Sequence, residues 1–484
     1  MISLIQNELT KIFKKKSIYI TLFITLIFII VINVIYVNSN NNYGYDPEQD
    51  IKFYESQLEI LQEDNSQSAK EAISMYQSEI DSAKLVQKYG DTATWQASII
   101  YKQIRPMFME KNEYLQTGNK QAAQEVQIQI EELVTKLDAG DWRYFATQEL
   151  QEIENSIQEQ KQLKENTTNT DSIASIEDQI FDLNLQKQVV NWRLEKDIPY
   201  GYSYWNTCLI NYQDAQREIR DYERSSNQDN YLAKQSYYHS LEMSAISQYD
   251  IEHKVESGNS SNARGLLLNG CSQFELFIII MIIMVTGTIV SEEFNKGTIK
   301  LLLIKPYKRS TILASKWITS LIMLIIIIIS ILLMQLVVGG IVQGFDTFDT
   351  PAIVYDHTTD QIGEMNIIAY LIMQILGKLP IYILLMTLAF AFSTIFANSA
   401  LAITITLLGY MGAPFVNTIA QAYNLDWIKF FVTPNWDLTQ YFFGGLPEFQ
   451  GLTPIFSIGI IIVYMLIMLI PTFVFFKKKN IKNI

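Results

Sequence analysis

The chain has 484 residues, of which 49% are hydrophobic and only 18% are charged, and its formal net charge is −13. Its apolar residues are clustered in blocks of about 20, the length that crosses a hydrocarbon core of about 30 Å, so the composition excludes a soluble protein and predicts an integral membrane protein. The acidic balance argues against a nucleic-acid partner, because phosphate binding needs clustered Lys and Arg.

Residues 1–16 predict a basic amphipathic helix that lies in the membrane interface. Its apolar positions follow a helical stripe: Ile2, Ile5, Leu9, Ile12 and Phe13. Residues 17–38 follow, uncharged from Ile18 to Val37, and predict the first transmembrane helix. A cleaved signal peptide is the alternative, but no small-residue cleavage pattern precedes the Asn-rich stretch after Val37. We therefore expect an uncleaved helix whose amino end is cytoplasmic.

Residues 39–272 contain no segment that could cross a membrane, and we expect them to form an extracellular helical domain. Apolar residues recur there at steps of three and four, as in Val126, Ile130, Leu133 and Leu137 and again in Asp171–Lys196. This period is typical of helices that share a buried seam. The turns are predicted by Gly90, Gly118, Gly140 and the polar run Asn166–Asn169. The pattern predicts five or six helices in antiparallel hairpins, packed within one chain.

Cys208 and Cys271 are the two cysteines, and both are expected on the outer side, where a disulfide is permitted. We expect two unpaired, partly buried thiols. The three histidines have no spacing typical of ligands, so no metal site is predicted.

Residues 273–476 are expected to supply five further transmembrane helices, and 477–484 a cytoplasmic tail. The apolar runs are 274–290, 317–342, 367–396, the second half of 379–425, and 455–476, with a turn at Ala397-Asn398-Ser399. The loop Gly344–Asn366 is acidic without Lys or Arg, as an outer, solvated loop should be. The fold class predicted is an all-α polytopic membrane protein with six transmembrane helices and a large helical extracellular domain.

Lys378 stands inside an apolar run, just before Pro380. A lysine within a transmembrane helix is costly and marks a candidate site on a transport pathway. The alternative is that its ammonium extends to the lipid headgroups. The aromatic segment between the last two helices, with Trp427, Phe430, Phe431 and Trp436, suits the membrane interface or an outer gate.

Residues 291–316 form a charged loop between the second and third apolar runs. Glu292 and Glu293 are followed by the basic residues Lys296, Lys300, Lys305, Lys308, Arg309 and Lys316. Such an excess of Lys and Arg next to transmembrane helices marks the cytoplasmic side. The order along the loop is a Glu pair, Gly297-Thr298, Leu301-Leu302-Leu303, Pro306, and then Arg309 and Lys316.

This order resembles the loop after the second transmembrane helix of ABC type-2 exporter permeases, which typically reads EE…GT…LL…P…R…K. The resemblance covers the membrane part of the chain; an ordinary positive-inside loop is the alternative. In that family the loop forms a short coupling helix that docks on a separate ATPase subunit, and a helix like residues 1–16 forms an elbow before the first transmembrane helix. The coupling residues that the resemblance implies are Glu292, Glu293, Phe294, Gly297, Thr298, Leu301, Leu302, Pro306 and Arg309.

No GxxxxGK[ST] motif occurs, so we expect this chain to bind no cofactor and catalyse no reaction, with ATP and Mg²⁺ bound by the partner ATPase. The resemblance implies a second permease subunit, identical or related. Six transmembrane helices and the basic clusters predict that both termini are cytoplasmic, and the frequent use of Lys, Asn and Ile indicates a bacterium, so we expect a bacterial plasma membrane. The resemblance also implies export of an amphipathic substrate such as an antimicrobial peptide, a drug or a lipid-like compound. Sodium efflux is one alternative. The other is a membrane-anchored protein that binds or senses an extracellular ligand.

Overall fold

The computed structural model describes residues 1–41, 44, 46–61, 66–226, 228–299, 307–423 and 425–479. The protein is an all-α polytopic membrane protein, as predicted, with one two-stranded sheet among its described residues. It divides into two compact units. The first, which we call the membrane unit, comprises Met1–Val37, Asn227–Tyr238 and Ser257–Ile484; the second, the helical unit, comprises Asn38–Ser226 and His239–Glu256. The helical unit is thus smaller than the domain 39–272 expected from the sequence.

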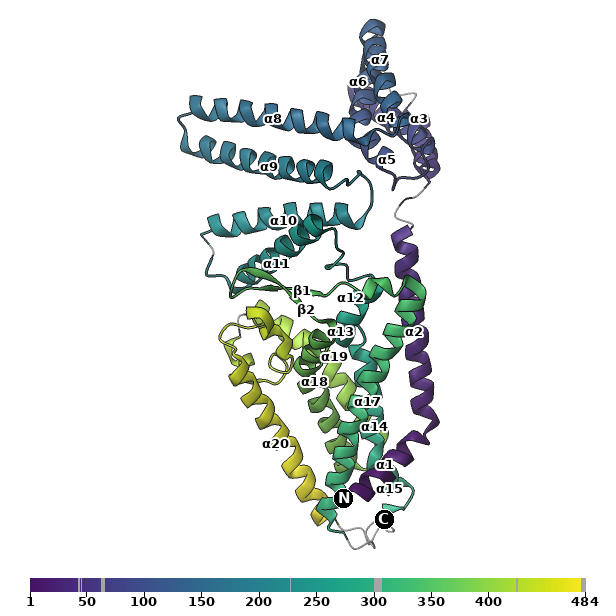
Figure 1. The fold of residues 1–484 in the computed structure, drawn as a ribbon, viewed down its shortest axis with the longest axis vertical. Helices are drawn as coiled ribbons and strands as arrows, with labels where there is room; N and C mark the ends of the chain where they lie inside the picture. Colours follow the sequence, from purple (N-terminus) through teal and green to yellow (C-terminus); the bar gives the residue numbers. More distant parts are fainter. Residues whose placement is uncertain are drawn as a thin grey trace. The chain divides into compact units, whose positions relative to one another are not determined.

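The membrane unit contains six helices that are long and apolar enough to cross a membrane (Figure 1). They are α2 (Lys16–Asn41), α14 (Glu275–Ile289) continued by α15 (Ser291–Asn295), α17 (Arg309–Gln343), α18 (Ile367–Phe396), α19 (Ser399–Ala422) and α20 (Pro454–Lys478). The short helix α1 (Ile2–Phe13) precedes them, and α12 (Ala263–Leu268) and α13 (Gly270–Gln273) lead into α14. The structure therefore has the six helices predicted from the apolar runs.

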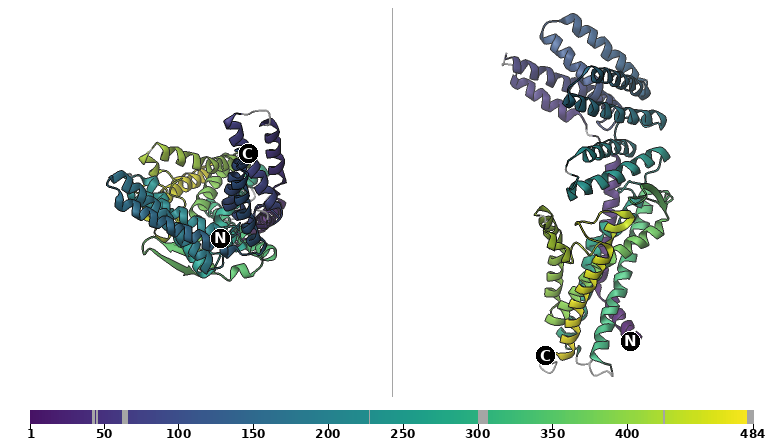
Figure 2. Two further views of the ribbon diagram at one scale, coloured as in Figure 1. Left: turned by 90° about the horizontal axis from the view of Figure 1, so that it is seen from above. Right: turned by 90° about the vertical axis from the view of Figure 1, so that its left-hand side faces the viewer.

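α14 lies among α17, α18 and α19, and its side chains form the centre of the membrane unit's core. Ile278 and Ile282 of α14 are fully buried, and so are Tyr382 and Phe390 of α18. α2, α19 and α20 instead expose much of their apolar surface, as helices in contact with lipid do. α1 and the end of α20 lie at one end of this unit, which we call the α1 end (Figure 2).

The turn between α18 and α19 confirms the prediction made at Ala397-Asn398-Ser399. Ala397 adopts a left-handed conformation with φ of 52°, which ends α18. Asn398 then caps α19, because its side-chain oxygen accepts a hydrogen bond of 3.2 Å from the backbone N–H of Leu401.

The loop predicted at Gly344–Asn366 is only partly a loop. It begins with the short helix η2 (Asp346–Phe348), and the antiparallel strands β1 (Ala352–Asp356) and β2 (Gln361–Met365) follow, with Ala352 opposite Met365. Asp356 shapes the turn between the strands by accepting a hydrogen bond of 2.8 Å from the N–H of Thr358. The segment between α19 and α20 contains two short 3₁₀ helices, η3 (Asp426–Phe430) and η4 (Leu438–Gly444).

The helical unit contains more helices than the five or six predicted. They are α3 (Glu48–Leu61), α4 (Gln67–Gln87), α5 (Trp95–Ile99), the π-helix η1 (Ile100–Ile104), α6 (Arg105–Gln116), α7 (Lys120–Asp138), α8 (Trp142–Asn166), α9 (Thr170–Glu195), α10 (Tyr204–Arg224) and most of α11 (Tyr231–His253). Gly90, Gly118 and Gly140 have positive φ and lie at helix ends, as predicted. Five or six helices is an underestimate, because capping residues such as Ser66 and Thr94 begin helices that the apolar periodicity alone does not separate.

The repeating apolar positions of this unit are buried between its own helices. Val126, Ile130 and Leu137 of α7 belong to one buried cluster with residues of α6, η1 and α8. Ile153 and Ile157 of α8 pack with α9 in the same way. Both cysteines are free and buried, as expected: Cys208 in the helical unit and Cys271 in the membrane unit.

We predict that residues 46–256, expressed alone, fold into a helical, cooperatively unfolding fragment, and that Ile130→Asp abolishes this fold. Ile130 is 2% exposed, and burying an unpaired carboxylate costs several kcal/mol, a large share of a stability of about 5–15 kcal/mol. Ile128→Asp is the control, because Ile128 lies on the same helix but is 47% exposed. Circular dichroism during heating measures both. A disordered parent fragment, or equal melting of the two variants, would contradict the prediction.

Candidate functional site

Helix α1 lies against α17 at the α1 end of the membrane unit. The face that it buries consists of Leu4, Glu8 and Ile12, one residue per turn. This face differs from the stripe predicted from the sequence, since Ile2 and Phe13 are exposed. The acidic residue Glu8 lies in the middle of the buried face, although the other residues of the helix are mostly basic or apolar.

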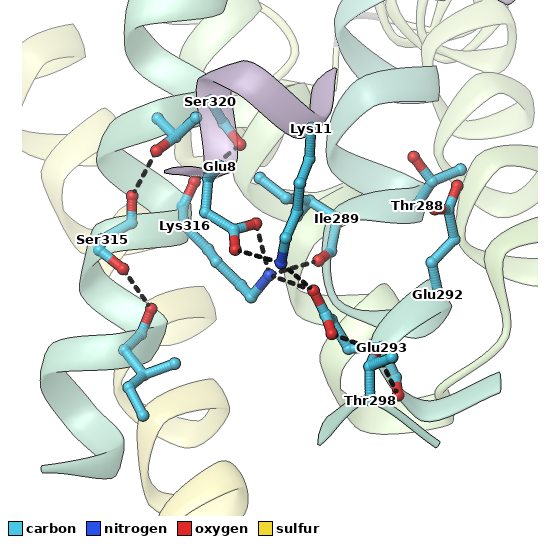
Figure 3. A network of polar contacts seen from close by, with 12 residues as sticks. Glu8, Lys11, Thr288, Ile289, Glu292, Glu293, Thr298, Ser315, Lys316 and Ser320 are labelled. Atoms are coloured by element: carbon cyan, nitrogen blue, oxygen red, sulfur yellow. Dashed lines mark hydrogen bonds and ion pairs between the residues drawn. The ribbon is translucent and has the colours of Figure 1, made fainter. Parts of the chain in front are cut away.

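Glu8 belongs to a network of four charged side chains drawn from three parts of the chain (Figure 3). The Lys316 ammonium of α17 lies 2.6 Å from Glu8 Oε2 and 3.5 Å from Glu293 Oε1 of α15. It also donates a hydrogen bond of 2.9 Å to the backbone oxygen of Ile289, in the last turn of α14. Lys11 completes the network, with its Nζ 2.7 Å from Glu293 Oε1 and 3.0 Å from Glu8 Oε1.

Lys316 has almost no access to solvent, because its side chain is only 1% exposed. A buried ammonium is tolerated when it is paired and when its N–H groups are satisfied, and both conditions hold here. The network balances two cations against two carboxylates. Burial alone would lower the pKa of Lys11, but the hydrogen bonds to Glu293 and Glu8 outweigh it, and the pKa is raised above its ordinary value.

A second set of contacts extends the network along α15. Lys15, between α1 and α2, lies 2.7 Å from Glu292 Oε1 and donates a hydrogen bond of 2.8 Å to the Thr288 hydroxyl. Thr298 donates a hydrogen bond to Glu293 from beyond the end of α15. Helix α1 and Lys15 just after it are therefore held to α14, α15 and α17 by charge-assisted hydrogen bonds.

The Glu pair has partners within its own chain. Glu292 and Glu293 face Lys15, Lys11 and Lys316, and their expected contact with basic residues of a partner stays a prediction. Phe294 is likewise buried, 6.5 Å from the ring of Phe476 in α20.

The other predicted coupling residues are placed differently. Gly297 has a φ of 71° and open space around its Cα, and Thr298 is bonded to Glu293 as described. Leu301, Leu302 and Pro306 lie outside the described residues. Arg309 begins α17 and donates hydrogen bonds to the backbone oxygens of Lys477 and Lys479, at 3.2 and 2.9 Å, which ties α17 to the end of α20. Among the loop residues that the structure describes, Lys296, Tyr307 and Lys308 are exposed, and so are Asn295, Gly297 and Ser310.

Lys378 occupies a second charged cluster, at the opposite end of α14. Its Nζ lies 2.9 Å from Glu275 Oε2, in the first turn of α14, and 2.7 Å from Asp437 Oδ2, just before η4. Tyr410 of α19 donates a hydrogen bond of 3.0 Å to the other oxygen of Glu275. The Lys378 side chain is 11% exposed and paired twice, so the interpretation that it extends to lipid headgroups is wrong. We call Lys378, Glu275, Asp437 and Tyr410 the Lys378 cluster.

The predicted aromatic residues separate into two groups. Trp436 packs beside Tyr410, with 6.5 Å between the ring centroids, and so adjoins the Lys378 cluster. Trp427, Phe430 and Phe431 are exposed and lie outside it, as membrane-interface residues do. Glu8 and Asp437 leave only weak signals in the sequence: Glu8 is an acid within a basic helix, and Asp437 is an acid among aromatic residues.

Comparison with known proteins identifies the family. The model of DUF2705, described as a protein of unknown function, matches residues 235–482. The chain belongs to DUF2705. The matched DUF2705 region includes α14 to α20, with Glu293, Lys316 and the whole Lys378 cluster, but not Glu8 or Lys11 of α1.

Two Bacillus subtilis (strain 168) proteins are similar to this DUF2705 chain. "Uncharacterized protein YhcI" is 30% identical over 276 residues, which are 56% of this chain and 84% of the relative. "Uncharacterized membrane protein YdbK" is 28% identical over 228 residues, which are 47% of this chain and 87% of the relative. No solved structure matches.

We predict that Lys316→Met destabilises this DUF2705 protein by about 3–5 kcal/mol, because the substitution leaves Glu8 and Glu293 buried with one cation between them. The control is Lys296→Met, which removes the surface pair of Lys296 with Glu292 and should cost less than about 1 kcal/mol. Titration of the purified protein from a mild detergent into SDS measures the free energy of unfolding. An equal loss of unfolding free energy in the two variants would refute the role of Lys316 as the buried partner of Glu8 and Glu293.

Proposed function

We propose that this protein is the transmembrane permease subunit of an ATP-driven exporter of the ABC type-2 class, which moves an amphipathic substrate out of the cell. The observation that carries the proposal is the buried network at the α1 end. It joins the head of the EE…GT…LL…P…R…K loop to α1 on one side and to α17 on the other.

The network provides a mechanical reason for this pattern of residues. A partner that pushes on the loop displaces α15, and the contacts of Glu293 with Lys11 and Lys316 carry the displacement to α1 and α17. α1 passes it to α2 through the few residues that separate them. Breaking the network instead would leave buried charges unpaired, at a cost of several kcal/mol, so these helices move together.

The partner in this proposal is an ABC ATPase subunit that binds ATP and Mg²⁺. Exposed Lys296, Tyr307 and Lys308 offer it a basic, partly aromatic surface, while the Glu pair contributes from within by holding the loop in place. In this proposal the α1 end lies in the cytoplasm of a bacterium, with both termini inside and the protein in the plasma membrane; the excess of Lys and Arg at that end supports this orientation. A second permease subunit, identical or related, completes the pathway.

The Lys378 cluster closes the other end of the pathway in this proposal. It ties α14, α18 and α19 to the segment between α19 and α20. Besides these ion pairs, η4 packs directly on α18. A Cβ at Gly377 would lie only 2.6 Å from the Thr439 side chain. Paired intramembrane charges of this kind mark functional positions.

The test is purification of the tagged protein from its host in a mild detergent, with an ABC ATPase expected among the proteins that copurify. Lys296→Glu combined with Lys308→Glu should weaken this association on the order of tenfold, because two attractive charges become repulsive at an exposed surface. Lys234→Glu combined with Lys429→Glu makes the same change of charge away from the loop and should leave the association intact. The proposal fails if no ABC ATPase copurifies, or if the two double variants behave alike.

A further inference from the structure

A cavity of about 490 Å³ lies in the membrane unit, where the first residues of α11 meet the end of α19, η3 and the segment before α20. It is separate from the network at Lys316 and from the residues of the Lys378 cluster. The residues of its wall that matter for recognition are Asp229, Tyr231, Asp426, Lys429, Glu448 and Phe449.

The charges around the cavity favour a cation. Asp229, Asp426 and Glu448 contribute carboxylates, and Lys429 is the one basic side chain among the lining residues that the structure describes. The rings of Tyr231 and Phe449 are part of the same wall, beside apolar residues such as Leu425 and Ile428. Aromatic faces attract cations, and apolar walls attract the hydrocarbon part of a ligand.

Glu448 is the most informative of the three acids. Its Oε2 accepts a hydrogen bond of 2.7 Å from Asn417 Nδ2, and its backbone N–H donates one of 2.8 Å to Gln440 Oε1, so the residue is held at the wall. Burial raises the pKa of its carboxyl group above the ordinary value, and the negative charge of Asp437 adds to this, against the effect of Asn417. A buried carboxylate near a second acid is stabilised when a positive charge binds beside it.

The wall on the α11 side is also held in place. The Tyr231 hydroxyl and Gln235 Nε2 both donate hydrogen bonds of 2.8 Å to the backbone oxygen of Pro447, next to Glu448. On the α19 side, Gln421 Nε2 donates one of 3.3 Å to the backbone oxygen of Glu448. A cavity whose walls are bonded to each other keeps its shape without a ligand, as ligand sites commonly do.

We propose that this cavity binds an amphipathic organic cation, with the charge against Glu448 and Asp426 and the apolar part against Tyr231 and Phe449. Exposed Trp427 and Phe430, on η3 beside the cavity, give such a molecule a route from the membrane interface. Binding is a property of this chain by itself. Only the further statement that the bound cation is the exported substrate rests on the proposed function.

The test compares tetraphenylphosphonium with tetraphenylborate, which have the same shape and opposite charge, by equilibrium binding to the purified full-length protein. Tetraphenylphosphonium should bind with one saturable site and tetraphenylborate should not. Glu448→Gln, which keeps an oxygen for Asn417, should weaken binding of the cation about tenfold, and Asp426→Asn should weaken it less, because Asp426 is exposed.

Glu364→Gln is the matched control, because it removes a carboxylate from β2, away from the cavity, and should leave binding unchanged. The proposal is overturned if tetraphenylphosphonium does not bind, if both ions bind equally, or if the Glu448 and Asp426 variants bind like the control. None of these measurements uses an ATPase. Binding without a copurifying ATPase would therefore keep this site and reject the exporter, and the reverse result would do the opposite.

Discussion

The ion pairs of Lys316 are the interactions on which the α1 end of the membrane unit depends. An ammonium with a side chain that is 1% exposed is stable only while Glu8 and Glu293 face it. Since Glu8 lies 308 residues away along the chain, the first helix of the protein is placed by a residue in its third transmembrane helix. α1 is thus more than an amphipathic helix resting on a membrane surface, because it supplies a carboxylate that the buried lysine needs.

Two consecutive helices, α14 and α15, join the two charged clusters of the membrane unit. α14 begins at Glu275, in the Lys378 cluster, and continues through α15 to Glu293, in the Lys316 network. The separation of about 18 residues corresponds to about 27 Å along a helix. Under the proposed function, α14 and α15 carry a displacement from Glu293 toward Glu275, because closely packed interiors transmit strain. This arrangement offers a physical route between the loop at one end and the segment near η4 at the other.

The sequence predicted those parts of the fold that leave a continuous or periodic signal. Apolar runs of about 20 residues predicted the six transmembrane helices, and the small polar turn at Ala397-Asn398 separated two of them. The loop motif directed attention to Glu293. It could not show that Glu293 is bonded to Lys11 and Lys316, because contacts between residues far apart in a sequence leave no periodic trace.

The same reason explains the other differences between the sequence predictions and the structure. Lys378 was recognised as unusual, but its partners Glu275 and Asp437 come from separate segments, and only the folded chain brings them together. β1 and β2 have five residues each, too short for alternation to stand out within an acidic stretch. The predicted residues Leu301, Leu302 and Pro306 stay predictions, since they lie outside the described residues.

The central claim is that the buried charges lock α1 to α17, and a distance measurement between spin labels tests it most directly. One label replaces Asn7, exposed on α1, and the other replaces Ile329, which is exposed on α17 and lies about 20 Å along the helix from Lys316. Cys208 and Cys271 are replaced beforehand. The claim predicts one narrow distance distribution that becomes broad in the Lys316→Met variant. A broad distribution in the parent protein, or a narrow one that the substitution leaves unchanged, would contradict it.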